Sequence, residues 1–207
     1  MLYRIGHFLF KLYFKLFYRL RVIGKEHIPG GGPLLICANH ISWFDPLLLA
    51  CVLPVKFRVH FMAKEELFRN RFFAFILKKL GAFPVNRGAA DYAAIKKAYQ
   101  LLQEGKVVFL FPEGSRSANG QLQKAKDGAA LIAARQPVPI LPAAVIGPYR
   151  IGRPLQVRFG PTFTLPNFEF SGRQEKKERL GKMSVLIMEK IGELLPARMH
   201  SDNHDFN

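Results

Sequence analysis

One histidine and one aspartate, five residues apart, have the types and spacing that could do chemistry. His40 and Asp45 lie in the segment 39–45, NHISWFD. On a regular helix five residues turn by about 500°, which leaves two side chains about 140° apart. The two side chains can therefore meet only if His40 lies in a loop and Asp45 lies at the helix start, as a possible N-cap, that the following Pro46 predicts.

A histidine beside a carboxylate can act as a general base. The carboxylate fixes one ring nitrogen, leaves the other free to accept a proton and stabilises the imidazolium that results. No serine or cysteine occurs in a GxSxG arrangement, so the base would act directly on a substrate hydroxyl. A structural histidine next to a helix-capping aspartate fits the same spacing, and on the pair alone both interpretations stand.

Two cationic side chains are candidates for binding an anionic group. Arg87 lies in the segment 84–88, PVNRG, and its guanidinium has a fixed fork of donors that matches a phosphate. Lys126 lies at the start of a predicted helix and could add a second cation to an anion pocket. Ordinary solvated surface charges are the alternative for both residues.

The segment 111–117, FPEGSRS, directly follows a strongly apolar stretch. Gly114 permits a ligand to approach the backbone closely. Ser115 and Arg116 could bind phosphate or glycerol oxygens, while Glu113 could hold a hydroxyl or orient the arginine. A plain Glu–Arg surface pair is the alternative.

Apolar strands alternate with helices along most of the chain. A short strand is predicted between the N-terminal helix and the turn at 29–33, and further predicted strands cover 34–38, 58–62, 83–85, 106–111, 140–146 and 156–159. Predicted helices begin at Asp45 and cover 71–80, 89–104, 126–135 and 173–195. This alternation predicts an α/β fold, with a mixed, mostly parallel sheet flanked by helices. The candidate segments 39–45, 84–88 and 111–117 lie at the ends of three of these strands. In such folds the loops after the strands build the site.

The N-terminal segment predicts an amphipathic helix. Its cationic residues recur every three or four positions and so share one stripe: Arg4, His7, Lys11, Lys15 and Arg19. A second stripe is aliphatic, with aromatic rings beside it: Leu2, Ile5, Leu9, Leu12, Leu16 and Leu20. Such a helix suits the interface of an anionic membrane. Packing against its own domain is the alternative.

Chain length and charge complete the expected organisation. The 207 residues fit one domain, so we expect a membrane-associating helix over 1–21, a folded domain over 22–198 and a tail over 199–207. No apolar run in the helix approaches the about 20 residues needed to cross a bilayer. The net charge of +16 favours an anionic partner, either nucleic acid, a membrane surface or a phosphorylated substrate.

Two of the possible ligand classes lack a supporting motif. No RNP-like or helix-turn-helix pattern occurs, so we expect no nucleic acid partner. The histidines form no HExxH arrangement, and Cys37 and Cys51 form no CxxC pair. We therefore expect no metal site and two buried thiols in a reducing compartment.

Taken together and in order, these segments resemble the glycerolipid acyltransferase family typified by 1-acyl-sn-glycerol-3-phosphate acyltransferase. The NHxSxxD, GxxPVxR and FPEGTRS motifs of that family match segments 39–45, 81–87 and 111–117, and its VPIxPV segment resembles 138–143. Ser115 stands for the usual Thr, Ala143 for Val, and Ala125 for an aromatic residue often found before Lys126.

The resemblance implies a reaction and roles for residues. His40 would deprotonate the sn-2 hydroxyl of 1-acyl-sn-glycerol 3-phosphate, Asp45 would support the imidazolium, and phosphatidic acid would form. The residues implied to bind the acceptor are Arg87, Glu113, Gly114, Ser115, Arg116 and Lys126. The acyl thioester would be acyl-CoA or acyl-acyl carrier protein, with no further cofactor and no metal.

The resemblance also implies a place of action, at the cytoplasmic face of the cell membrane, as a peripheral or monotopic protein. The motifs are shared among relatives with other acceptors, so a different lysophospholipid or glycerol 3-phosphate is an alternative. A membrane-binding protein without catalytic activity is a second alternative. The intact His40, Asp45 and Glu113 argue against it.

Overall fold

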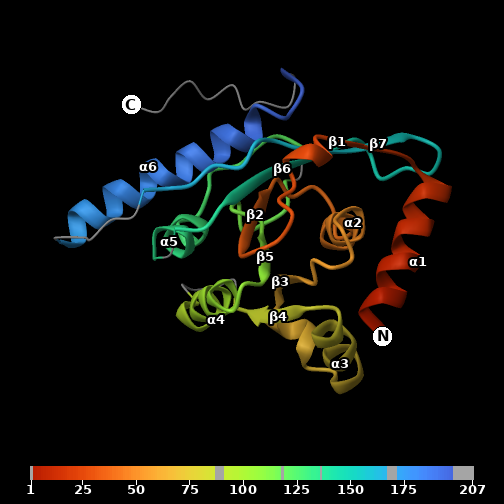
Figure 1. Ribbon diagram of the computed structural model, residues 1–207, viewed down its shortest axis with the longest axis horizontal. Helices are drawn as coiled ribbons and strands as arrows, with labels where there is room; N and C mark the ends of the chain where they lie inside the picture. Colours follow the sequence, from red (N-terminus) through yellow and green to blue (C-terminus); the bar gives the residue numbers. More distant parts are fainter. Residues whose placement is uncertain (1, 87–90, 118, 136, 167–171, 198–207) are drawn as a thin grey trace.

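The computed structural model describes residues 2–86, 91–117, 119–135, 137–166 and 172–197 (Figure 1). Seven strands form one sheet in the order β1-β7-β6-β2-β5-β3-β4. Their bounds are β1 Arg19–Ile23, β2 Leu34–Ala38, β3 Val59–Lys64, β4 Ala82–Val85, β5 Val107–Leu110, β6 Ile140–Ile146 and β7 Pro154–Phe159. Neighbouring strands are parallel except β6 and β7. The predicted α/β fold with a mixed, mostly parallel sheet is confirmed.

Helices cover both faces of this sheet. They are α1 Leu2–Phe17, α2 Asp45–Val52, α3 Arg71–Lys79, α4 Tyr92–Gln103, α5 Gly128–Arg135 and α6 Arg173–Gly192. In Figure 1, α4, α5 and α6 lie on the opposite side of the sheet from α2. The side chains of β2, β5 and β6 are accordingly buried on both faces, and this explains why these strands are continuously apolar.

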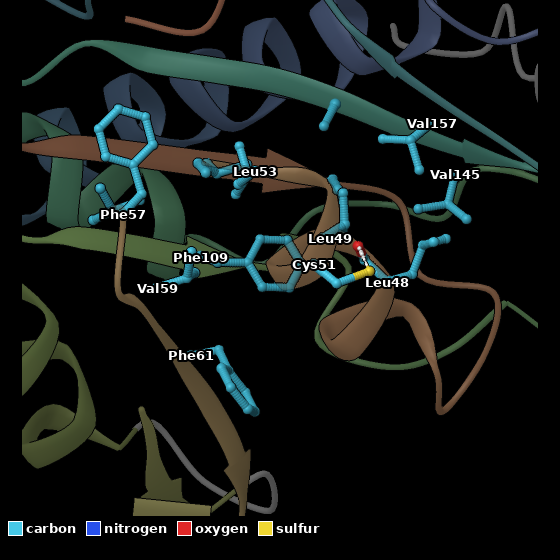
Figure 2. Close-up of a cluster of buried hydrophobic side chains, with 14 of the residues drawn as sticks. Leu48, Leu49, Cys51, Leu53, Phe57, Val59, Phe61, Phe109, Val145 and Val157 are labelled. Atoms are coloured by element: carbon cyan, nitrogen blue, oxygen red, sulfur yellow. Dashed lines mark hydrogen bonds between the residues drawn. The ribbon is translucent and has the colours of Figure 1, made fainter. Parts of the chain in front are cut away.

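The hydrophobic core on the α2 side of the sheet contains an aromatic ring from β5 and a thiol from α2. Figure 2 shows Leu48 and Leu49 of α2 against Phe109 of β5, beside Cys51. The Cys51 thiol donates to the Leu48 carbonyl oxygen, 3.2 Å away. Burial raises the pKa of Cys51 to about 12, so the thiol stays neutral. Cys37 is also buried and unpaired, as its apolar surroundings predicted.

The carboxyl ends of three neighbouring strands meet at one edge of the sheet. Cys37 of β2 is paired with Leu110 of β5, and Ala38 is paired with Ala143 of β6. Since β2, β5 and β6 run parallel, the loops after them emerge side by side. These loops hold most of the candidate residues.

The N-terminal helix ends earlier than the predicted boundary at residue 21. It stops at Phe17, and Arg19–Ile23 form the edge strand β1 parallel to β7. The hairpin before β7 ends the helix, because Gly152 N–H donates to the Phe17 carbonyl oxygen at 2.8 Å and Arg19 N–H donates to the Arg153 carbonyl oxygen at 3.3 Å. Tertiary hydrogen bonds therefore override the helical pattern of this segment.

Helix α1 packs on the domain through its aromatic side and exposes its aliphatic side. Phe14 is fully buried, whereas Leu9 and Leu16 are 56% and 68% exposed. His7 departs from its predicted place among membrane headgroups, since its Nε2 lies 3.0 Å from the Leu53 carbonyl oxygen. Packing against its own domain therefore describes one side of this helix, and docking of the exposed side on a membrane stays a prediction.

Most other predicted elements differ from the observed ones by one to three residues at their ends. Helix α5 begins at Gly128 rather than at residue 126, and α6 ends at Gly192 rather than at residue 195. The predicted helix over 89–104 is observed from Tyr92, where the Asp91 side chain caps it by accepting from Ala94 N–H at 2.9 Å. Residues 89 and 90, and the predicted tail from residue 199, lie outside the described residues.

None of the helices in the described part of the chain has the length and apolar character needed to span a bilayer.

Candidate active site

The loop after β2 brings His40 and Asp45 into contact. His40 Nδ1 lies 2.8 Å from Asp45 Oδ2, and both side chains are buried. A carboxylate oxygen only accepts hydrogen bonds, so Nδ1 carries the proton and Nε2 is the nitrogen left for a substrate. This is the contact that the five-residue spacing allowed.

Asp45 achieves this contact as the first residue of α2 and not as its N-cap, which corrects the sequence-based expectation. Phe44 occupies the cap position, with no side-chain cap. The Asp45 carboxylate turns back into the loop, where its Oδ2 accepts from Ile41 N–H at 2.7 Å and from Ser42 N–H at 2.8 Å. One oxygen thereby holds both the loop backbone and the imidazole.

The other oxygen of Asp45 is held by a residue that the sequence analysis did not identify. Tyr149 donates its hydroxyl to Asp45 Oδ1 at 2.6 Å. Burial, and secondarily the Asp45 charge, raises the pKa of Tyr149, so the phenol stays protonated as a donor. Tyr149 lies in the segment 147–149, GPY, directly after β6. The end of this fourth strand is the feature of the sequence that could have pointed to Tyr149.

The imidazole and backbone of His40 are fixed by the loop after β5. The His40 ring stacks on Phe111, with 3.7 Å between centroids and 10° between planes. Glu113 Oε1 accepts from His40 N–H at 3.0 Å, and the His40 carbonyl oxygen accepts from Ser117 N–H at 2.8 Å. The two motifs predicted to form one site are therefore linked by direct hydrogen bonds.

Glu113 is buried behind His40, with only 2% of its surface exposed. Its Oε2 is buried without a well-aligned hydrogen-bond partner among the described residues. Burial, and to a smaller extent the Asp45 charge, raises the pKa of Glu113 to about 7, although backbone N–H groups of His40 and Gln123 oppose the shift. In this structure Glu113 positions the His40 backbone and does not line the cavity described below.

Asn39 joins the loop after β2 to β6. Its side chain donates to the Val145 carbonyl oxygen at 3.0 Å and accepts from Val145 N–H at 2.8 Å. The Asn39 amide thereby continues the pairing of β2 with β6 by one step beyond the strand. This explains why an asparagine precedes the histidine.

The other polar residues of segment 111–117 lie at the surface. Arg116 is exposed, and its Cζ lies 3.9 Å from the ring centroid of Trp43, which is 59% exposed. This cation–π contact joins the two motifs on their outer side. Ser115 is exposed and donates to Gln123 Oε1 at 3.3 Å.

Gly114 and Lys126 lie together on one wall of a cavity. Gly114 has φ +71°, and a Cβ added there would lie 2.8 Å from Lys126 Cδ, so glycine leaves room for the lysine. The Lys126 N–H donates to the Pro112 carbonyl oxygen at 2.8 Å, which holds the lysine beside the loop. Arg87 lies outside the described residues.

The cavity has a volume of about 620 Å³ and is lined by His40 together with mostly apolar side chains. It lies between the sheet and helices α4, α5 and α6, and its apolar wall includes Phe61, Met62, Ile95, Leu131 and Leu180. Small-molecule sites commonly have volumes of about 300–1,000 Å³ and combine apolar walls with a few polar groups. The fold and cavity define an α/β protein with a histidine–carboxylate pair beside a largely apolar cavity.

Comparison with known proteins identifies the family. The sequence model of the family described as Acyltransferase matches residues 19–146. The 1-acyl-sn-glycerol-3-phosphate acyltransferase of Bacillus subtilis (strain 168) is 33% identical over 182 residues, which cover 84% of this chain and 87% of that protein. This chain therefore belongs to the acyltransferase family.

Two further similarities agree with this membership. The 1-acyl-sn-glycerol-3-phosphate acyltransferase of Streptococcus pneumoniae (strain ATCC BAA-255 / R6) is 38% identical over 115 residues, which cover 55% of this chain and 42% of that protein. The crystal structure of PlsC from Thermotoga maritima, a 1-acyl-sn-glycerophosphate (LPA) acyltransferase, superimposes with a TM-score of 0.67 at 23% identity. That superposition covers 90% of this chain and 78% of PlsC, and shows a shared fold.

Substituting Tyr149→Phe tests the hydroxyl that holds Asp45. The change leaves the buried Asp45 Oδ1 without this donor, so we expect the free energy of unfolding to fall by about 1–3 kcal/mol. Urea denaturation monitored by circular dichroism measures it. Tyr99→Phe is the matched control, because Tyr99 contacts an exposed Gln103 side chain, and an equal loss in both variants would contradict the role of Tyr149.

Substituting Glu113→Gln tests the burial of this carboxyl. An unfolded glutamate loses its proton near pH 4.5 and folded Glu113 near 7, so ionisation in the unfolded state destabilises the wild type as pH rises through this window. Glutamine does not titrate and keeps an oxygen acceptor for His40 N–H. We expect the stability of the variant relative to wild type to increase by about 2–3 kcal/mol between about pH 4 and pH 8. Urea denaturation at each pH measures this difference, and a difference between variant and wild type that stays constant across pH would contradict the prediction. Glu104→Gln, at an exposed position, is the matched control.

Proposed function

We propose that this acyltransferase moves a fatty acyl group from an acyl thioester to the sn-2 hydroxyl of 1-acyl-sn-glycerol 3-phosphate, which forms phosphatidic acid for phospholipid biosynthesis. The observation that carries the proposal is the buried His40–Asp45 pair on the wall of an apolar cavity. The names of relatives from three bacteria support the choice of acceptor, since each is a 1-acyl-sn-glycerol-3-phosphate acyltransferase.

His40 acts as the general base in the proposed reaction. Its Nε2 accepts the proton of the acceptor hydroxyl as the oxygen attacks the thioester carbonyl carbon. Asp45 stabilises the resulting imidazolium through the 2.8 Å contact with Nδ1. The tetrahedral intermediate then expels the thiolate, which leaves with a proton from the imidazolium, and the ester is formed.

The acceptor phosphate is bound by cations beside this pair. Lys126 lines the cavity together with His40, and exposed Arg116 extends the positive surface beyond Trp43. We propose Lys126, Arg116 and Arg87 as phosphate ligands, with Gly114 and Ser115 in the adjoining loop. Glu113 contributes by positioning the His40 backbone, through the 3.0 Å hydrogen bond to His40 N–H.

The apolar cavity suits one fatty acyl chain. Each methylene that leaves water contributes about 0.8 kcal/mol, so the walls formed by Leu131, Ile132 and Leu180 favour a long chain. Acyl-CoA and acyl-acyl carrier protein are both anionic, and the net charge of +16 attracts either donor. No further cofactor takes part in this mechanism.

Docking on an anionic membrane surface brings the site to its acceptor. The aliphatic side of α1 is exposed, and α3 adds Phe72, Phe73 and Phe75 with exposures of 68%, 59% and 56%. The two helices lie close together, since a Cβ on Gly6 of α1 would lie 3.0 Å from Leu80 after α3. Exposed apolar side chains next to lysine and arginine suit an anionic interface. We propose that this peripheral or monotopic docking takes place at the cytoplasmic face of the cell membrane.

Substituting His40→Ala tests the general base. We expect acyl transfer to fall by about 10²–10⁴-fold with lysophosphatidic acid and either donor, in a detergent assay that measures phosphatidic acid. His27→Ala is the control and should retain activity, since His27 is not among the residues that line the cavity. Activity retained by His40→Ala would refute the mechanism, and a folded wild type that acylates no lysophosphatidic acid would refute the acceptor.

Substituting Leu9→Gln and Leu16→Gln together tests the docking side of α1. Both side chains are exposed, so the fold should be retained while two leucines lose their transfer free energy of about 1.5–3 kcal/mol each. We expect binding to anionic vesicles to weaken at least tenfold in co-sedimentation. Deleting the whole of α1 is a poorer test, because it also removes the contacts of the buried Phe14 with the core. Ile23→Gln, at an exposed position of β1, is the control, and equal binding of all three proteins would contradict docking through α1.

A further inference from the structure

A second concave site lies between α1 and the body of the domain, away from the His40 cavity. This cleft has a volume of about 660 Å³. Arg4 and Lys11 line it from α1, Lys25 lines it from the short 3₁₀ helix Lys25–His27, and Lys56 lines it from the segment after α2. In the described part of the chain, no aspartate or glutamate lines this cleft.

The four cations of the cleft are not neutralised by ion pairs. None of them forms a salt bridge with a described residue. Lys56 Nζ donates to the Gly30 carbonyl oxygen at 2.7 Å, and an ammonium has three donors, so others remain for a ligand. His7 Nε2 lies 3.0 Å from the carbonyl oxygen of Leu53, the residue that follows α2, and both residues line the cleft. The described lining of the cleft is therefore positively charged.

The cleft also has a fixed place relative to the exposed side of α1. Successive residues on a helix lie about 100° apart, so Arg4 and Lys11 fall between the buried Phe14 and the exposed row of Ile5 and Leu12. Phe8, which is 63% exposed, lines the cleft on the same flank. When the exposed row lies in the acyl region of a bilayer, the cations lie at the level of the headgroups.

We infer that this cleft binds the phosphate headgroup of an anionic phospholipid of the bilayer, with the phosphate among Arg4, Lys11, Lys25 and Lys56. The inference rests on the membrane docking proposed above. A lipid is favoured over a free phosphate because Phe8 and the exposed leucines adjoin the cations on one side. The anionic headgroup of one lipid then contacts the cations, and its acyl chains contact the exposed apolar side chains.

The test is the double substitution Lys25→Gln and Lys56→Gln, which leaves α1 unchanged. Each lysine near an anionic surface contributes roughly 1 kcal/mol, so we expect affinity for phosphatidylcholine vesicles containing phosphatidylglycerol to fall by about 10- to 30-fold. Binding to phosphatidylcholine vesicles without the anionic lipid should be unchanged. Flotation of vesicles with the purified full chain measures both affinities.

A matched control removes the same charge elsewhere. Lys177 and Lys182 are exposed on α6, which packs on the opposite face of the sheet from α1. Charges separated by more than about 8 Å are largely screened, so Lys177→Gln/Lys182→Gln should change the affinity less than twofold. Equal weakening in the two double variants would overturn the inference. It would also be overturned if calorimetry showed inorganic phosphate bound by the wild type and lost in Lys25→Gln/Lys56→Gln while vesicle affinity stayed unchanged.

Acyl transfer separates this inference from the proposed function. In detergent, Lys25→Gln/Lys56→Gln should retain wild-type acylation of lysophosphatidic acid, because neither lysine lines the His40 cavity. A wild type that shows the predicted vesicle binding but no acyl transfer would refute only the proposed reaction. A wild type that binds no anionic vesicles would refute both the docking and the headgroup site.

Discussion

The carboxylate of Asp45 has no exposed surface, and an ionised group without water is costly unless donors surround it. Four donors do so: the His40 ring, the N–H groups of Ile41 and Ser42, and the Tyr149 hydroxyl. They come from the loop after β2 and from the segment after β6. Satisfying one buried charge therefore sets the position of the loop, the start of α2 and the orientation of the proposed base.

The parallel order of β6, β2 and β5 is what makes this convergence possible. Three strand ends reach the same edge, so Tyr149 and Glu113 contact the loop after β2 from the segments after β6 and β5, and Asn39 of that loop bonds Val145 of β6. Several of these contacts use backbone groups of residues 40–42. The backbone hydrogen bonds therefore hold the loop independently of the imidazole ring.

Helix α1 connects the catalytic domain to the proposed membrane surface. Its aromatic side buries Phe14 against the core, and its opposite side exposes leucines. A helix packed on one side cannot tumble relative to the His40 site, so docking through the other side would orient the whole domain. The cations between the two sides would then set the depth at which the domain rests on the headgroups.

The sequence by itself determined the α/β class, most of the strands and helices, the buried thiols, and the pairing of segments 39–45 and 111–117 in one site, because each follows from local periodicity or motif spacing. Only the tertiary structure decided the contact of Tyr149 with Asp45, the burial of Glu113 behind His40, and the end of α1 at Phe17. Those features depend on hydrogen bonds and burial between segments far apart in the chain. A local pattern such as the strand end before Tyr149 can mark a position, but it does not specify the distant partner.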